Sequence, residues 1–281
     1  DPMTSLASAS PPPTASRLPL QMVGGWEVGL LVFMVALYLV GVWINPAFFG
    51  TTDAFSAVLR DTARFGVMAV GMTFVIVNKE LDLSVGSILG LVATVFSIAY
   101  APSHFDLPVG WAILAAVVAG VAIGLVNGVL VTRLKVPAFI ATLTMLFIGR
   151  GLVLGLTGGK TIGFDRKAAG DPLFFAIGET NALGFNNQIL VFLVVAVLGA
   201  VLLAKTRTGY ETYAVGGNEQ AASYAGIAAK WVRMRAYLFS ALAATLAGLM
   251  NVAQDKGITS QYGQGAELIV IAAVIVGGAS I

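Results

Sequence analysis

Long apolar runs alternate with short polar connections along almost the whole chain. The longer runs match the roughly 20 residues of helix that cross about 30 Å of hydrocarbon. Such runs cover residues 28–44, 65–77, 87–100, 111–131, 138–156, 189–204, 236–252 and 267–281. The pattern predicts a polytopic, all-α membrane protein rather than a soluble domain around one core.

The composition agrees with this class. Of the 281 residues, 58% are hydrophobic and only 11% are charged, and the mean hydropathy is +0.89. These values are too apolar for a soluble globular domain. The chain has no Cys and a single His, His104, which excludes disulfides, thiolate chemistry and a histidine metal cluster. Residues 1–25 are rich in Pro, Ser and Ala, so we predict a disordered leader followed by a transmembrane domain over 26–281.

Basic residues concentrate in two connections. They are Arg133 and Lys135 in the first, and Lys205, Arg207, Lys230, Arg233 and Arg235 in the second. Because cytoplasmic loops carry the excess of Lys and Arg, both connections and the N-terminus are predicted to be cytoplasmic. Arg60 and Arg64 fall on the outer side in this topology and count against it. The net charge of +2 therefore reports topology, and no nucleic-acid partner is expected.

The stretch VNKELDLSVGS, residues 77–87, places Lys79, Glu80 and Asp82 between two apolar runs. Each charge at the centre of a bilayer costs about 2.5–3.5 kcal/mol, so residues 65–100 cannot form one lipid-facing helix. Two interpretations remain open. The stretch is either a buried, irregular break between two half-spans, restarted at Ser84 and Gly86, or a tight cytoplasmic turn with solvated charges.

The sequence GAELIVIAAVIVGG, near the end of the chain, again places an acidic residue, Glu267, at the start of an apolar run. It lies an odd number of spans after the first stretch, which predicts the opposite orientation, as in inverted repeats of transporters. Arg150 lies within an apolar run and either snorkels to the interface or faces a cavity. The candidate residues of a translocation pathway are Asn78, Glu80, Asp82, Ser84, Arg150 and Glu267.

Small residues recur in the run 111–131. Gly120, Gly124 and Gly128 follow a four-residue spacing, which predicts a face for close helix packing. Asn127 beside them is predicted to form a hydrogen bond between helices. The motif GLTGGKT, residues 155–161, has the wrong glycine spacing for a phosphate-binding loop and is rejected as a nucleotide site.

The connection 205–235 is predicted to contain a short helix over 219–224. Asn218 is a suitable N-cap, a Gly-Gly pair breaks the chain before it, and Gly226 ends it. The helix has little apolar moment, so it fits a groove on another protein better than a membrane surface. Its candidate docking residues are Gly216, Gly217, Asn218, Glu219, Ala221, Ala222 and Gly226.

Four ordered motifs carry a resemblance to a known family. They read AVGMTFVIVNKELDLSVGS, KVPAFIATLTMLFIGRGL, TRTGYETYAVGGNEQAASYAGI and GAELIVIAAVIVGG. The chain from about residue 45 to its end resembles the permease subunits of bacterial ABC importers for simple sugars. The resemblance implies a fold like that of the type II, vitamin-B12-importer permeases. Such permeases have about ten spans, so the last two are expected to be missing here.

The resemblance also implies partners. They are a cytoplasmic ABC ATPase that holds ATP and Mg²⁺, a periplasmic sugar-binding protein, and a second permease copy in a homo- or heterodimer. The segment 205–235 would then be the cytoplasmic segment that couples to the ATPase. No cofactor, metal or catalytic residue is expected in this chain itself.

The implied function is translocation of a simple sugar, such as a pentose, hexose or sugar alcohol, across the bacterial inner (plasma) membrane. An alternative is an ion-coupled secondary transporter in which Asp82 and Glu267 titrate. It would need neither the ATPase nor the docking helix. A membrane-embedded enzyme has little support, because no Ser, Cys or His stands in a recognisable constellation with a base.

Overall fold

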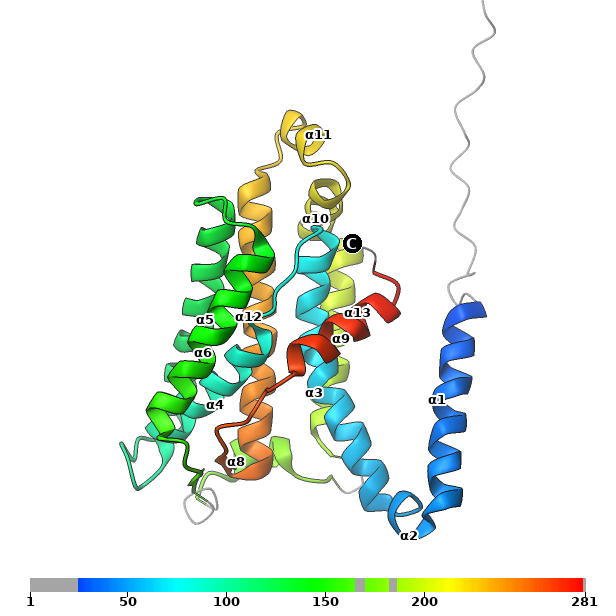
Figure 1. Ribbon diagram of the computed structural model, residues 1–281, viewed down its shortest axis with the longest axis vertical. Helices are drawn as coiled ribbons and strands as arrows, with labels where there is room; N and C mark the ends of the chain where they lie inside the picture. The colour runs from blue at the N-terminus through cyan, green and yellow to red at the C-terminus, as the bar shows by residue number, and fades with distance from the viewer. Residues whose placement is uncertain (1–24, 165–169, 182–185, 280–281) are drawn as a thin grey trace, which may run out of the picture. The chain divides into compact units, whose positions relative to one another are not determined.

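The computed structural model describes residues 25–164, 170–181 and 186–279 (Figure 1). The predicted leader therefore lies outside the described residues, except for Gly25. The chain divides into two compact units, residues 1–51 and 52–281. In the first, α1 (Gly25–Ile44) is followed by α2 (Pro46–Phe49), which Asn45 caps by accepting a hydrogen bond from the Phe48 N–H. Most apolar side chains of α1 are exposed within this unit, as expected of a helix that faces lipid.

The second unit is a helical bundle, which confirms the predicted class. Its larger helices are α3 (Thr52–Val77), α4 (Val85–Tyr100), α5 (Val109–Thr132), α6 (Ala138–Thr157), α9 (Gln188–Lys205), α12 (Ala229–Asp255) and α13 (Ala266–Val276). Its smaller elements are β1 (Ile162–Gly163), α8 (Pro172–Phe175), the 3₁₀ helix η1 (Ala176–Gly178), α10 (Arg207–Gly217), α11 (Glu219–Tyr224) and β2 (Gly257–Ile258).

Four helices among the described residues, α5, α6, α9 and α12, are long and apolar enough to cross a membrane by themselves. The apolar parts of α1, α4 and α13 are shorter. Helix α3 is different, because its 26 residues, about 39 Å of helix, begin well before the apolar run 65–77 and end with it. Its first half carries charged residues, so hydropathy alone reveals only its second half.

Helix α12 lies at the centre of the second unit and packs against α3, α4 and α5. Small residues permit this close packing. In α5, Gly120 faces Thr245, Gly124 faces Ala241 and Gly128 faces Met234, and a Cβ atom at any of the three would collide with its neighbour on α12. The glycine face of α5 is thus a packing face in the structure.

The two ends of the bundle differ. We call the end that carries α11 the inner end; the connection between α5 and α6 lies at the same end (Figure 1). The opposite, outer end carries α8, η1 and a small antiparallel sheet in which Ile162 pairs with Ile258 and Gly163 with Gly257. The glycines of the rejected nucleotide motif end α6 there, with φ values of 59° at Gly158 and 73° at Gly159.

Helices α4 and α13 both begin inside the bundle and run in opposite directions. Residues 78–84 lead from the inner end of α3 down to the start of α4, which continues toward the outer end (Figure 1). Residues 259–265 lead from the outer end of α12 up to the start of α13, which continues toward α10. The two half-span helices are therefore arranged as the inverted pattern predicts.

Candidate functional site

The charged stretch 78–84 is enclosed by the bundle. Asn78, Glu80, Asp82 and Ser84 are 2%, 9%, 1% and 0% exposed. Of the two interpretations left open by the sequence, the structure shows the buried break and not the solvated turn. Only Lys79 of the three charged residues is exposed, in a left-handed conformation with a φ of 60°.

Asp82 organises the end of this break. Its Oδ1 accepts hydrogen bonds from the Ser84 N–H at 2.9 Å and from the Ser84 hydroxyl at 2.6 Å, and its Oδ2 accepts one from the Ser240 hydroxyl at 2.8 Å. The Asn127 amide donates to the Ser84 hydroxyl at 2.8 Å. Three segments that are distant in sequence thus meet here, since α12 bonds to Asp82 and α5 bonds to Ser84.

These contacts change the roles expected from sequence. Ser84 makes no side-chain capping bond to α4, because its hydroxyl is committed to Asp82. The Asn78 amide likewise donates to the Phe74 carbonyl at 2.8 Å. In this conformation the polar groups of Asn78, Asp82 and Ser84 stabilise the break, and their assignment to a translocation pathway stays a prediction.

Glu80 faces α12. Its Oε1 lies 3.1 Å from the Nε of Arg233, and its Oε2 accepts a hydrogen bond from the Tyr237 hydroxyl. A carboxylate this deeply buried is stable only when it is paired and hydrogen-bonded. Both conditions are met by two residues one turn apart on the same helix.

A second polar centre lies where the N-terminal ends of α4 and α13 meet. A Cβ at Gly86 would collide with the Glu267 carboxylate and the Gly263 carbonyl, and the Arg150 guanidinium lies beside the same glycine. Arg150 donates to the Tyr262 carbonyl at 2.5 Å. The guanidinium therefore turns into the bundle, which favours the cavity-facing interpretation of Arg150 over snorkelling.

This second centre holds hydrogen-bonding capacity that the described residues do not use. One guanidinium nitrogen of Arg150, NH2, and one carboxylate oxygen of Glu267, Oε2, are buried without a hydrogen-bond partner in the described part of the chain. A donor and an acceptor in this state can bind hydroxyl groups or water. Among the predicted pathway residues Asn78 also has an unpartnered oxygen, but at Gly86 an unpartnered donor and an unpartnered acceptor lie near each other, as a polyhydroxylated solute needs.

The inner end carries the predicted docking helix. Helix α11 has the predicted bounds, Asn218 caps it by accepting a hydrogen bond from the Ala221 N–H at 3.0 Å, and Gly226 follows with a φ of 82°. Glu219 and Ala221 are exposed, whereas Ala222 is buried. A small apolar cluster of Val215, Ala222, Ala229 and Val232 fixes α11 against α10 and α12.

The interruption predicted at Gly216 and Gly217 lies at Asn218, which is extended and separates α10 from α11. Helix α10 continues through both residues, and Gly216 packs so closely on the inner end of α3 that a Cβ would collide with the Val77 carbonyl. Gly217 has open space around it and is exposed. The sequence shows a glycine at position 216, but it does not show that the backbone of α3 occupies the space that a side chain would need.

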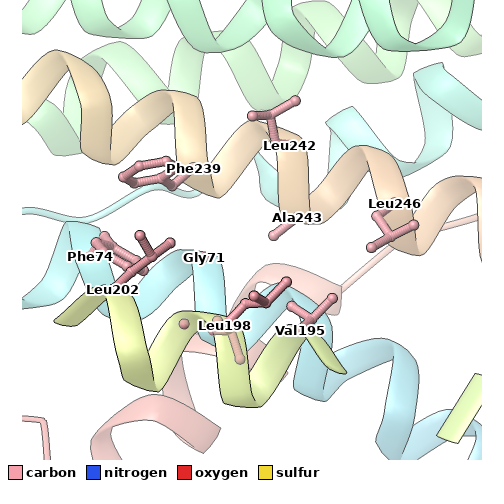
Figure 2. Close-up of a pocket in the computed structure, with 11 residues that line it drawn as sticks. Gly71, Phe74, Val195, Leu198, Leu202, Phe239, Leu242, Ala243 and Leu246 are labelled. Atoms are coloured by element: carbon pink, nitrogen blue, oxygen red, sulfur yellow. The ribbon is translucent and has the colours of Figure 1, made fainter. Parts of the chain in front are cut away.

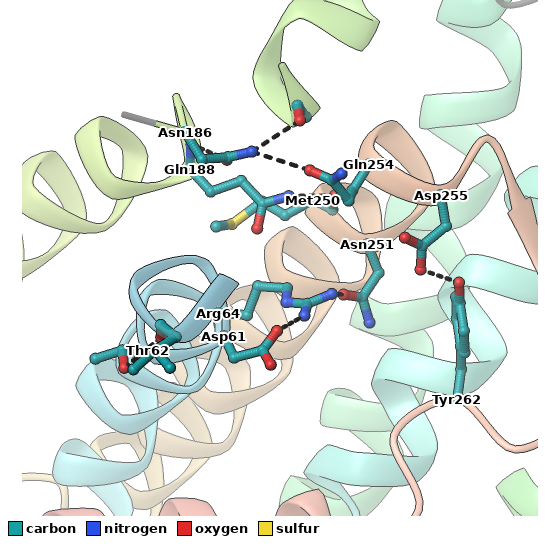
Figure 3. Close-up of polar contacts among 12 residues, drawn as sticks. Asp61, Thr62, Arg64, Asn186, Gln188, Met250, Asn251, Gln254, Asp255 and Tyr262 are labelled. Atoms are coloured by element: carbon teal, nitrogen blue, oxygen red, sulfur yellow. Dashed lines mark hydrogen bonds and ion pairs between the residues drawn. The ribbon is translucent and has the colours of Figure 1, made fainter. Parts of the chain in front are cut away.

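Polar contacts at the outer end explain Arg64, one of the two arginines that opposed the predicted topology (Figure 3). The Arg64 side chain lies between Asp61 and Asn251 and donates to both. Nearby, Asn186 donates to Gln254 at 3.0 Å, and the Tyr262 hydroxyl donates to Asp255. Arg64 thus joins α3 to α12 and is not a free positive charge, so it argues only weakly against an inner N-terminus.

An apolar cleft of about 190 Å³ lies between α3, α9 and α12 (Figure 2). All of its lining residues are apolar or glycine; they include Phe74, Leu198, Phe239, Leu242 and Leu246. No hydroxyl, amide or charged side chain lines this cleft, so it suits lipid chains and not a sugar.

Comparison with known proteins decides the class. The permease component family of branched-chain amino acid transport systems matches residues 54–281. The chain belongs to this family. It is 36% identical over 259 residues to the ribose import permease of Escherichia coli K12, covering 91% of this chain and 78% of that one. No solved structure matches.

Further relatives have similar names. The ribose import permease of Haemophilus influenzae is 35% identical over 92% of this chain and 79% of its own length. The autoinducer 2 import permease of Yersinia enterocolitica is 36% identical over 90% of this chain and 67% of its own. These relatives are permease subunits of ABC importers, so this permease is a transport subunit of the inner membrane and not an enzyme. The ion-coupled carrier has no support among them.

Proposed function

We propose that this permease moves a simple sugar or a related polyhydroxylated solute, driven by a separate ATPase and supplied by a periplasmic binding protein. The relatives named for ribose and for autoinducer 2 support a sugar-like solute over an amino acid. A neutral polyol needs hydrogen-bonding groups along its route rather than an ion pair at each end. The unpartnered donor of Arg150 and the unpartnered acceptor of Glu267 have this character.

The observation that carries the proposal is the placement of α11. It lies at the extremity of the inner end, the same end as the basic connection between α5 and α6 (Figure 1). Its exposed residues are not needed to cover the bundle, and one buried alanine fixes it to α10 and α12. We therefore assign α11 as the contact for the ATPase, which makes the inner end cytoplasmic, in agreement with the side predicted from the basic connections.

The substrate route in this proposal passes the meeting point of α4 and α13. The two helices begin inside the bundle from opposite sides, so a rigid shift of either changes the space around Arg150 and Glu267. A second copy of the permease would complete the route, as the resemblance implies. Selection of the solute is expected mainly on the binding protein.

Transport by purified components tests the proposal. The permease is reconstituted in proteoliposomes with the ATPase and binding protein encoded beside it, and uptake of labelled ribose and other sugars is measured. We expect uptake only when ATP and the binding protein are both present. Uptake driven by a proton or sodium gradient without ATP would overturn the proposal.

A cysteine cross-link tests the docking surface separately. Because the sequence contains no Cys, a single Ser223→Cys variant places one thiol on α11. Leu173→Cys is the matched control, since Leu173 is highly exposed at the outer end. We expect a cross-linker to join the ATPase to position 223 and not to position 173. Equal cross-linking at both positions, or none at 223, would exclude α11 as the docking helix.

A further inference from the structure

Arg233 contacts two carboxylates that belong to different parts of the molecule. Its Nε lies 3.1 Å from Oε1 of Glu80, in the buried break, and its NH2 donates to Oε2 of Glu219 at 2.9 Å, at the start of α11. The guanidinium thus forms ion pairs with both α11 and the break. It is carried by the first turns of α12.

The two contacts differ in burial. Glu80 is 9% exposed, whereas Glu219 is 47% exposed. The planar guanidinium presents several donors in a fixed fork, so one Arg can hold two carboxylates in a defined geometry, which a Lys ammonium does less well. A displacement of Glu219 therefore acts on Arg233, and through it on a carboxylate that cannot easily lose its partner.

We propose that Arg233 is a positioning residue that transmits movement of α11 to the 78–84 break and so to the start of α4. This inference rests on the proposed docking of α11 on the ATPase. When the ATPase moves α11, the ion pair with Glu219 moves Arg233, and Glu80 carries the shift into the break. Asp82 holds Ser84 through two hydrogen bonds, and the Ser84 carbonyl accepts hydrogen bonds from the Ser87 hydroxyl and the Ile88 N–H, both at 2.8 Å, so the shift passes into the first turn of α4.

A neighbouring ion pair provides the matched control. Arg235, on the same helix, contacts Glu211 of α10, and Glu211 also pairs with Arg207 at 2.8 Å. Glu211 therefore keeps a cation when Arg235 is removed. The Arg235→Gln variant loses an arginine of similar exposure from α12 but leaves the connection between α11 and the break intact.

A thiol at position 79 reports on the break. Lys79 is exposed and neighbours Glu80, and the sequence has no other Cys. In the complete complex with ATPase and binding protein, maleimide labelling of Lys79→Cys is measured with and without ATP. We expect a rate change with ATP in the Lys79→Cys parent and in its Arg235→Gln derivative. The change should be lost in the Arg233→Gln derivative and partly restored by Arg233→Lys.

Transport and ATP hydrolysis are measured on the same variants. With Arg233→Gln we expect uptake to fall about tenfold, in the range of typical coupling between sites, while basal ATP hydrolysis and ATPase binding remain. Arg233→Gln leaves the buried Glu80 carboxylate without its cation. The double variant Arg233→Gln with Glu80→Gln removes that unpaired charge. The relay requires the double variant to stay uncoupled, and recovery of uptake would show that only stability was lost.

The Glu219→Gln variant decides the matter if the Arg233 variants do not fold, since Glu219 is half exposed. ATPase binding is measured on the same variant, and we expect loss of the ATP-dependent labelling change and poor transport even when the ATPase is supplied at a concentration that saturates binding. Weakened ATPase binding as its sole defect would make Glu219 a docking residue and overturn the relay. If Arg233→Gln retains normal uptake, the relay fails but the proposed function stands. If the parent shows no ATP-driven uptake, the proposed function itself fails.

Discussion

The breaks before α4 and before α13 place two half-span helices in opposite directions, but different interactions hold them. The break 78–84 is fixed by side chains: Asp82 collects three hydrogen bonds, and Glu80 is paired with Arg233. The break 259–265 depends more on backbone. Gly263 and Gly265 have φ values of 72° and 78°, and Arg150 holds the Tyr262 carbonyl.

The difference indicates different mechanical properties. Buried, fully paired polar networks are rigid, because any partial opening leaves a costly unsatisfied group. The first break leaves the amide oxygens of Asn78 and Asn127 without partners, whereas the glycine-containing break has fewer side-chain contacts and leaves atoms of the charged residues Arg150 and Glu267 without partners. We therefore expect the first break to move as one piece with α11 and α12, and the second to adapt around the solute. The following experiments test this contrast.

The largest effect is expected from Asp82→Ala. This change leaves the donors of Ser84 and Ser240 unsatisfied in a site that is 1% exposed, and each unsatisfied group costs about 1–3 kcal/mol. We expect the unfolding free energy of the detergent-solubilised permease to fall by about 3 kcal/mol or more. Thermal and denaturant unfolding measure it.

Two variants control this result. Asp82→Asn retains the size and one carbonyl oxygen, and the Ser240 hydroxyl can rotate to accept, so it should cost much less. Asp53→Ala removes an exposed aspartate in the first turn of α3 and should cost under about 1 kcal/mol. Equal losses for Asp82→Ala and Asp53→Ala would mean that the first break is not held by its side chains.

A smaller effect is expected from Gly86→Ala. The added methyl group would collide with the Glu267 carboxylate and the Gly263 carbonyl, so the second break must shift. Overpacking of this kind costs about 1–3 kcal/mol. If the second break is the adaptable one, stability falls toward the lower end of this range while sugar uptake falls strongly. Gly151→Ala, with open space around it, is the matched control and should leave both unchanged.

The smallest effect concerns an ion pair outside both breaks. Hydrogen bonds from Arg235 and then Arg207 hold the pKa of Glu211 below its ordinary value. A carboxyl with a lowered pKa in the folded state stabilises the protein above its ordinary pKa and loses that contribution as the pH falls through the lowered value. We expect Glu211→Gln to reduce slightly the loss of thermal stability on acidification below pH about 4.5. An unchanged pH profile would show that these contacts contribute little.

Features set by local sequence could be predicted well. The Asn218 cap and Gly226 defined α11 to the residue, because capping involves groups within a few positions of each other. The cost of burying charges showed that residues 65–100 are not one helix, although it left the buried break and a solvated turn both open, and the glycine spacing of α5 identified a packing face. Each inference needed only the nearby sequence and the bilayer as solvent.

Contacts between distant segments could not be predicted in the same way. Asp82 and Ser240 are 158 positions apart, so no local pattern showed that this carboxylate is satisfied inside the bundle and is not facing an open route. The role of Gly216 depends on the Val77 carbonyl, and the role of Arg233 on two partners in different segments. The sequence indicates Arg233 only as one of the positive charges of a predicted cytoplasmic connection. Its ion-pair partners come close to it only in the folded bundle.

Helix α12 has a consequence for how the two membrane faces communicate. It is one unbroken helix from Ala229 to Asp255, so Arg233 near its inner end and Asn251 near its outer end are about 27 Å apart along a stiff axis. A stiff rod does not absorb a tilt applied at one end. A tilt of α12 that begins at Arg233 would therefore displace the contact between Asn251 and Arg64 at the outer end. ATP hydrolysis at the inner end would in this way alter the structure at the end where the solute enters.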